Sequence, residues 1–185
     1  MACDQKKAED TPSTVVFVDE SSFRLLPLCV RTFAPRGQTP ILRVPLAHPH
    51  LSVISAISLQ GACYAAIQST AFTSTTVIAF LHQLLDQIPG HVTVLWDGAP
   101  IHRSQAIKSF LAEGAAHRLH LERLPAYAPD LNPDEGVWSW LKRRLKNCCF
   151  PHITALQHAV QEGMTYLQQH TQLVARFFHA CPYLL

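Results

Sequence analysis

Apolar positions recur along this chain with two periods, and together the periods predict five strands with helices between them. Within residues 14–20 (TVVFVDE), Val15 to Val18 form a continuous apolar run that ends abruptly in two acids, as expected of a strand buried on both faces. Residues 51–68 predict two more strands that turn near Gly61. Residues 91–98 (HVTVLWDG) predict another buried strand, and residues 119–122 a fifth, less buried one.

Helical spacing occupies most of the remaining chain. Residues 73–90 combine a Ser/Thr cap, an apolar stripe and a Pro-Gly stop, and a second helix is predicted before Gly114. A third begins near residue 133, and two more patterns pass through residues 153–167 and 173–178. Strand, hairpin, helix, strand, helix, strand, helix is an α/β order, so we expect a five-stranded mixed sheet flanked by helices.

The 185 residues, 48% of them hydrophobic and 15% charged, suit one compact core. We expect a polar tail at residues 1–13, a main domain at residues 14–150 and C-terminal helices at residues 151–185 packed on that domain. A loop-like region follows the first strand and is marked by Pro27, Pro35, Gly37, Pro40 and Pro45.

Charge and cysteine usage add little about partners. The net charge of +2 leaves room only for a local basic patch. The six cysteines lack CxxC spacing, which favours a reducing compartment. Because there is no secretory segment and no apolar run of ~20 residues, we expect a soluble cytoplasmic protein without a membrane partner.

Two predicted buried strands end in acids. Adjacent strands lie ~4.8 Å apart, so if these two are neighbours, Asp19 and Asp97 meet at the carboxyl edge of the sheet, where α/β folds place ligands. Two anions so close need a cation, and Mg²⁺ prefers such oxygen ligands. Glu135, on the first turn of a later helix, can supply a third ligand for two-metal phosphoryl transfer. Glu20 points to the opposite strand face, where a structural pair is expected.

The segment around Glu135 also has a purely structural interpretation. Asn132 as N-cap, Pro133 at the first helical position and Glu135 at the third would form a capping box. The two strand-end acids favour the metal-binding role instead. Asp134 is expected to cap the helix dipole or act as an auxiliary carboxylate, and Asp130 to be a turn residue.

The three acids stand in motifs that resemble a known family. Asp19 in VDES, Asp97 in WDGAPIH and Glu135 in LPAYAPDLNPDEGVWSWLK are similar, in order, to the catalytic motifs of DDE transposases of the mariner superfamily, especially its bacterial insertion-sequence branch. The 37 residues at positions 98–134 match the spacing typical of that superfamily. The resemblance includes residues 34–40 (APRGQTP) and spans about residues 14–146. It implies a ribonuclease-H-like fold, two Mg²⁺ or Mn²⁺ ions, and cutting and joining of DNA ends.

The motifs depart from the family pattern at three positions. Gly98 stands where relatives usually have Asn, and Ala126 and Ala128 stand where they often read LPPYSP. A lost amide can loosen the orientation of a metal ligand. Similar transposases carry helix-turn-helix modules before the catalytic domain, so we expect the second half of a split or frameshifted transposase. Its implied partners are transposon-end and target DNA, the helix-turn-helix half, and further copies of itself, near the bacterial nucleoid.

Several other residues are candidate DNA contacts. His102 matches the histidine of the second family motif and can contact phosphate, order its loop or be a structural histidine. A basic run after Glu135 suits phosphate contacts, although such a helix face is often only solvated. The run consists of Lys142, Arg143, Arg144 and Lys146. Trp138 and Trp140 are interpreted as packing residues.

Three alternatives complete the predictions. Cys148, Cys149 and His152 lack the spacing of a zinc finger, so zinc is disfavoured. A catalytically silent remnant that only binds DNA or protein would retain the motifs without activity. A ribonuclease-H-like nuclease acting on other nucleic acids is the third alternative, and the family motifs argue against it.

Overall fold

The computed structural model describes residues 13–43, 49–126 and 128–181, and its centre is one five-stranded sheet. The strands are ordered β3-β2-β1-β4-β5, where β1, β2 and β3 are antiparallel neighbours and β4 and β5 extend the sheet in parallel. Their bounds are Ser13–Arg24 (β1), His50–Ser58 (β2), Cys63–Gln68 (β3), His91–Trp96 (β4) and Leu119–Arg123 (β5). The predicted mixed sheet is confirmed.

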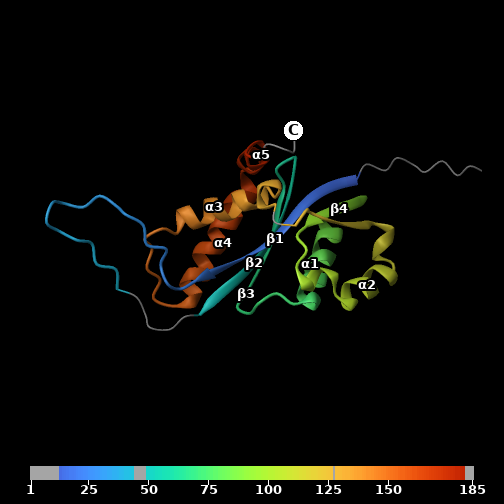
Figure 1. The fold of residues 1–185 in the computed structure, drawn as a ribbon, viewed down its shortest axis with the longest axis horizontal. Helices are drawn as coiled ribbons and strands as arrows, with labels where there is room; N and C mark the ends of the chain where they lie inside the picture. Colours follow the sequence, from blue (N-terminus) through green and yellow to red (C-terminus); the bar gives the residue numbers. More distant parts are fainter. Residues whose placement is uncertain (1–12, 44–48, 127, 182–185) are drawn as a thin grey trace, which may run out of the picture.

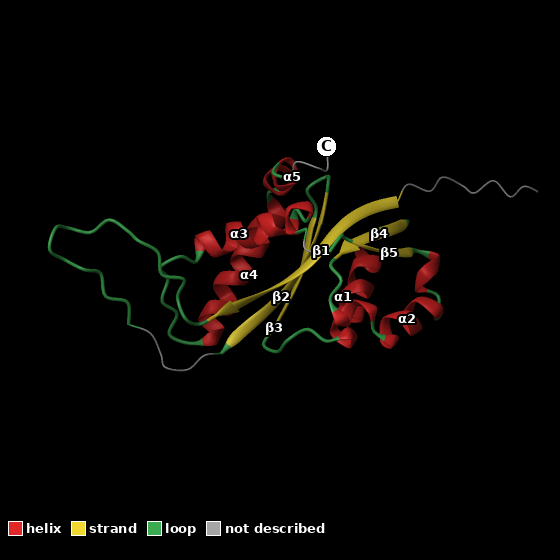
Figure 2. Ribbon diagram, in the orientation of Figure 1, coloured by secondary structure: helices red, strands yellow, loops and turns green. Residues whose placement is uncertain are grey.

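Helices cover both faces of this sheet, which gives three layers (Figure 1). Figure 2 shows α1 and α2 on one side of the strands and α3, α4 and α5 on the other. The five helices are Ser74–Gln87 (α1), Gln105–Ala112 (α2), Asp134–Arg144 (α3), Ile153–Gln169 (α4) and Thr171–His179 (α5). Short 3-10 turns lie at Pro100–Arg103 (η1), Ala115–His117 (η2) and Pro129–Leu131 (η3).

Alternation along β1 divides the interior into two cores. Val16 and Val18 belong to the core under α1 and α2, and Phe17 belongs to the core under α3, α4 and α5. Phe17 packs edge-on against Phe178 of α5, with ring centroids 5.6 Å apart. Asp19 therefore leaves β1 on the side of α3, and Glu20 leaves it on the other side.

The loop that follows β1 is long and exposed. It extends away from the sheet and helices (Figure 1), and the exposed fraction of the Phe33 side chain is 103%. Residues 34–40 lie in this loop, whereas Pro45 lies outside the described residues. Near its start, Leu28 forms a parallel bridge with Lys146, which ties the base of the loop to the end of α3.

The predicted end of the first strand is wrong. β1 continues beyond Asp19 and Glu20 to Arg24, because β2 pairs with it along this whole length. The parallel pairing with β4, however, stops at Phe17 and Leu95. Asp19 and Asp97 thus each lie two residues beyond the last β1–β4 pair, so the predicted meeting of the two strands is retained.

None of the helices in the described ranges combines the length and the apolar character that crossing a membrane requires.

Truncating one buried side chain between α1 and the sheet tests this packing. Leu84 has an exposed fraction of 0%, so Leu84→Ala should lower the free energy of unfolding by about 2–5 kcal/mol, since a cavity replaces buried methyl groups. Leu59 in the β2–β3 turn is 54% exposed, and Leu59→Ala is the matched control, with an expected change under about 0.5 kcal/mol. Urea unfolding measures both; equal losses would contradict the assigned packing.

Candidate active site

The three predicted acids line one pocket of about 430 Å³ at the carboxyl edge of β1 and β4. Asp19 comes from β1, Asp97 directly follows β4, and Glu135 is on the first turn of α3. Arg123, at the end of β5, also lines this pocket. The fold therefore brings together side chains from four separate elements, and three of them are carboxylates.

Asp19 is the most buried of these acids, and Trp138 holds it in place. The indole Nε1 of Trp138 donates a hydrogen bond of 2.9 Å to Oδ2 of Asp19. Burial raises the pKa of Asp19 to about 6; hydrogen bonds from Trp138 and the Glu20 backbone oppose this, while the charges of Glu135 and Glu20 add to it. Trp138 is a core residue, as its spacing on α3 predicts, and its role as a hydrogen-bond donor to Asp19 has no signal in the sequence.

Asp134 is the first residue of α3, and a hydrogen bond from β2 holds it. It is fully buried and accepts a 2.5 Å hydrogen bond from Ser55 Oγ on β2, the residue paired with Asp19. Its Oδ2 has no hydrogen-bond partner among the described residues. Burial raises the pKa of Asp134 well above its usual range, and the nearby acids add to the effect. Asp134 is therefore a buried anchor that does not line the pocket.

The capping box, which was the structural alternative at this helix, does not form. α3 begins at Asp134, and its N-cap is Pro133, which has no side-chain cap hydrogen bond. Asn132 Oδ1 accepts instead from the backbone N–H of Asp134 at 3.2 Å. A capping box would require the N–H of the next residue, Glu135. The Glu135 side chain is exposed and faces the pocket. Asp130 lies in the turn η3, as predicted.

His102 is buried and lies between Glu20 of β1 and Asp97, which follows β4. Its Nε2 lies 2.9 Å from Oε1 of Glu20, its Nδ1 lies 2.9 Å from Oδ1 of Asp97, and its ring stacks on Trp96 at 4.2 Å. Burial opposes protonation, but the hydrogen bond to Glu20 and the charges of Glu20 and Asp97 outweigh it, so the pKa of His102 is raised. This placement favours the interpretation that His102 orders the loop, and the expected structural pair of Glu20 is confirmed.

Oxygen donors and excess negative charge make this pocket suitable for a hard divalent cation. Within the described ranges, no three His, Cys, Asp or Glu side chains converge into a ready-made metal site, and the three acids share the walls of the pocket instead. Mg²⁺ needs only one or two protein carboxylates, because water and substrate oxygens fill the rest of its shell. Burial, with a smaller contribution from the charges of Glu135 and Glu20, raises the pKa of Asp19, and a bound cation would favour its ionised form. The donor set of Asp19, Asp97 and Glu135 thus fits such an ion.

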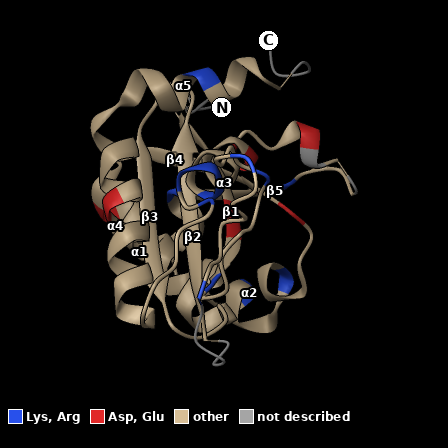
Figure 3. Cartoon of the chain, turned by 90° about the vertical axis from the view of Figure 1, so that its left-hand side faces the viewer, with Lys and Arg blue, Asp and Glu red and all other residues tan. Residues whose placement is uncertain are grey.

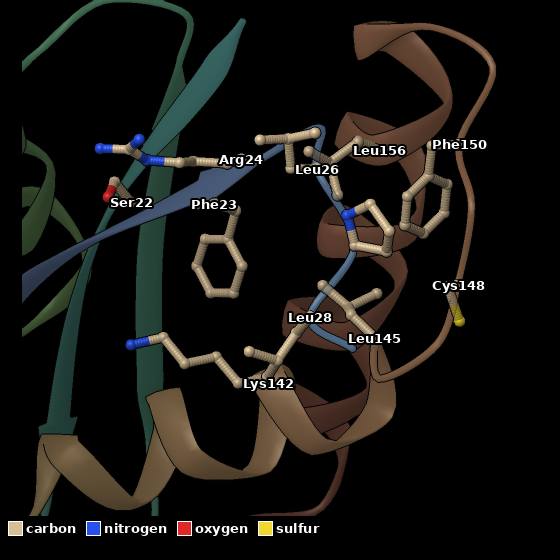
Figure 4. Close-up of a pocket in the computed structure, with 11 residues that line it drawn as sticks. Ser22, Phe23, Arg24, Leu26, Leu28, Lys142, Leu145, Cys148, Phe150 and Leu156 are labelled. Atoms are coloured by element: carbon tan, nitrogen blue, oxygen red, sulfur yellow. The ribbon is translucent and has the colours of Figure 1, made fainter. Parts of the chain in front are cut away.

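Three members of the predicted basic run lie in the last turn of α3, and Lys146 follows the helix. Figure 3 shows Lys and Arg positions in blue on α3. None of the four residues lines the carboxylate pocket. Lys142 lines a separate apolar pocket of about 250 Å³, where its ammonium group and the guanidinium of Arg24 lie on the same side (Figure 4). Arg144 lies 5.8 Å from the ring centroid of Trp140 and 6.0 Å from that of Tyr166. The members of the run therefore have different surroundings.

The cysteine pair after α3 shows no zinc-like arrangement. Cys148 Sγ donates weakly to the backbone carbonyls of Arg144 and Lys146. His152 is the N-cap of α4, and its Nδ1 accepts from the backbone N–H of Ala155. Cys148 and His152 therefore each have local hydrogen-bond partners.

Comparison with known families agrees with the site geometry. Residues 14–157 match the family described as DDE superfamily endonuclease. Because the match extends over most of the 185 residues, the chain belongs to this family. No curated protein was found to match the sequence.

Solved structures of the Mos1 mariner transposase have the same fold. The mariner Mos1 paired-end complex with Mg superposes with a TM-score of 0.71 at 18% identity, over 91% of this chain and 52% of that chain. The Mos1 strand transfer complex gives 0.65 at 17% identity, over 91% and 54%. The Mos1 catalytic domain gives 0.58 at 14% identity, over 91% and 80%. The predicted ribonuclease-H-like fold is thereby confirmed, and the chain spans about half the length of the Mos1 chains in the DNA complexes.

Replacing Asp19 tests whether ionisation of this buried carboxyl group lowers the stability of the folded protein. Because folding raises the pKa of Asp19 from 3.8 to about 6, the folded protein holds this proton more tightly than the unfolded chain. The metal-free protein should therefore lose stability as the pH rises from about 4 to about 6. Asp19→Asn removes this loss, so its free energy of unfolding at pH 7 should exceed that of the wild type by about 3 kcal/mol, with no difference below pH 4.

Urea unfolding in EDTA across this pH range measures the effect. Asp86→Asn is the matched control, because this acid on α1 is exposed, lies outside the pocket and is in none of the ion pairs of the described residues, so little change is expected. If Asp19→Asn has a lower free energy of unfolding than the wild type at pH 7, ionised Asp19 does not destabilise the folded protein and the prediction is wrong.

Proposed function

We propose that this chain is the catalytic part of a DNA transposase that cuts DNA strands and joins them to a target with the aid of divalent metal ions. The observation that carries the proposal is the shared pocket of Asp19, Asp97 and Glu135, built from two parallel strands and the start of a helix. Membership in the DDE superfamily endonucleases and the likeness to Mos1 transposase complexes with DNA ends support it.

The three carboxylates would hold two Mg²⁺ ions, or Mn²⁺ in their place. When bound, such ions activate the attacking oxygen and stabilise the leaving oxygen of a phosphodiester. The chain itself fixes the ligands before substrate arrives. Trp138 holds one oxygen of Asp19, and His102 together with the backbone N–H of Ala99 holds Oδ1 of Asp97. Preorganised ligands need no rearrangement during the reaction.

The wider biological assignment is also part of the proposal. The motifs favour the bacterial insertion-sequence branch, and a helix-turn-helix half of the same transposase would recognise the transposon ends. The assembled enzyme would act as a homo-oligomer on DNA near the nucleoid. Mixing the chain with an upstream-encoded helix-turn-helix protein and measuring co-elution on end DNA tests this association.

Nicking of supercoiled plasmid in Mn²⁺ tests the catalytic assignment. Asp97→Ala and Glu135→Gln should each lower the rate about 100-fold or more, because even the outer partners of metal ligands contribute 10–100-fold. Asp130→Asn is the matched control, since this acid lies in the exposed turn η3, outside the pocket. Wild-type nicking that survives both pocket substitutions would refute the assignment. A wild type without activity, even with the helix-turn-helix half present, would favour the inactive remnant.

The basic run and His102 are proposed to support DNA binding in different ways. Arg143 and Lys146 are exposed and suited to phosphate contact, whereas buried His102 would act by ordering the loop that carries Asp97. Replacing Arg143 and Lys146 together with Ala should lower the slope of log affinity against log salt by about two, one for each lost phosphate contact.

Fluorescence anisotropy with labelled duplex DNA measures this slope. Arg144→Ala is the comparison from the same helix turn and should change the slope less, because Arg144 lies over Trp140 and Tyr166. An unchanged slope in the double variant would leave the run as a solvated helix face.

A further inference from the structure

The missing side chain at Gly98 creates space for a cation in the carboxylate pocket. A Cβ atom at Gly98 would lie 2.5 Å from both Cζ and Nη2 of Arg123, well inside any real contact distance. Any larger residue at position 98 must therefore displace this guanidinium. The close approach of Arg123 depends on the absence of a side chain at this position.

The backbone of Arg123 is fixed by the sheet. Arg123 pairs with Trp96 across β4 and β5, and the backbone N–H of Leu124 donates to the carbonyl of Trp96 at 2.8 Å. Trp96 directly precedes Asp97, so the two strands end side by side. As a result, the guanidinium lies over Gly98 on the wall that also carries Asp97.

The guanidinium is available for an incoming ligand. Within the described ranges, the ion pairs are all formed by histidines, and Arg123 is in none of them. Oδ1 of neighbouring Asp97 is already engaged by the backbone N–H of Ala99 at 2.8 Å and by Nδ1 of His102 at 2.9 Å. Arg123 is also exposed, so water or a ligand reaches its five N–H donors.

We propose that Arg123, admitted by Gly98, binds a backbone phosphate of DNA at the mouth of the carboxylate pocket. This inference rests on the proposed function and adds a substrate-binding residue to it. A guanidinium matches phosphate oxygens through two parallel hydrogen bonds, which gives orientation as well as charge. A phosphodiester that enters a pocket lined by three acids meets repulsion, and a cation on the wall offsets part of it.

A double-mutant cycle measures this contact. Binding of a fluorescein-labelled DNA duplex is followed by anisotropy in Ca²⁺, which takes similar oxygen ligands. Arg123→Ala should weaken binding about 10-fold, the size expected for a lost hydrogen bond to a charged group, and lower the salt slope by about one. Gly98→Ala should weaken binding similarly, because its Cβ displaces the guanidinium. In the Arg123→Ala background, Gly98→Ala should have no further effect.

Lys108→Ala on α2 is the control, since it removes one exposed positive charge outside the pocket. Circular dichroism spectra and melting temperatures of the variants establish that each is folded. If Arg123→Ala and Gly98→Ala match this control, or if their effects simply add, the proposal is overturned. If the wild-type protein does not bind the labelled duplex, both this inference and the proposed function are overturned. DNA binding that depends on Arg123 in a chain that never nicks plasmid would support the contact and refute the catalytic proposal alone.

Discussion

Burial of the Asp19 carboxylate in a pocket that it shares with two other acids is the constraint on which the rest of this site depends. Asp19, Asp97 and Glu135 line the pocket together, and burial with nearby negative charge raises the pKa of Asp19 to about 6. Neighbouring side chains stabilise the acids of the site through hydrogen bonds and ion pairs. Trp138 donates to Asp19, and His102 lies between Glu20 and Asp97. The pocket thus contains three acids and one arginine, and these acids are stabilised by hydrogen bonds. A bound divalent cation would neutralise the remaining negative charge.

Because β1 lies in the middle of the sheet, its neighbouring residues Asp19 and Glu20 contact elements on opposite faces of the sheet. β1 lies between antiparallel β2 and parallel β4, and successive residues point to opposite cores. Asp19 therefore meets α3 through Trp138, whereas the next residue, Glu20, meets His102 of η1. Because β2 continues to pair with β1 beyond Asp19, the catalytic candidate is held within a sheet rather than on a free strand end.

Local patterns were enough to predict much of this arrangement. The apolar runs located the strands and helices, and the acids after two buried strands indicated which positions meet once those strands pair. Glu135 was less certain from sequence, because a capping box and a metal ligand require the same residue types at the same spacing. The structure forms no such box, since Asn132 bonds to Asp134 instead. The extension of β1 to Arg24 was missed because its later residues are polar, and its pairing partner lies on a distant segment.

By itself, the sequence determined the order of elements and the candidate acids, since periodicity and residue type are local properties of the chain. Only the tertiary structure decided which side chains support those acids. Trp138 lies 119 residues from its acceptor Asp19, and Ser55 lies 79 residues from Asp134. The approach of Arg123 to Gly98 likewise follows from the pairing of β4 with β5. Contacts of this kind depend on strand register and helix placement, which no local pattern in the chain encodes.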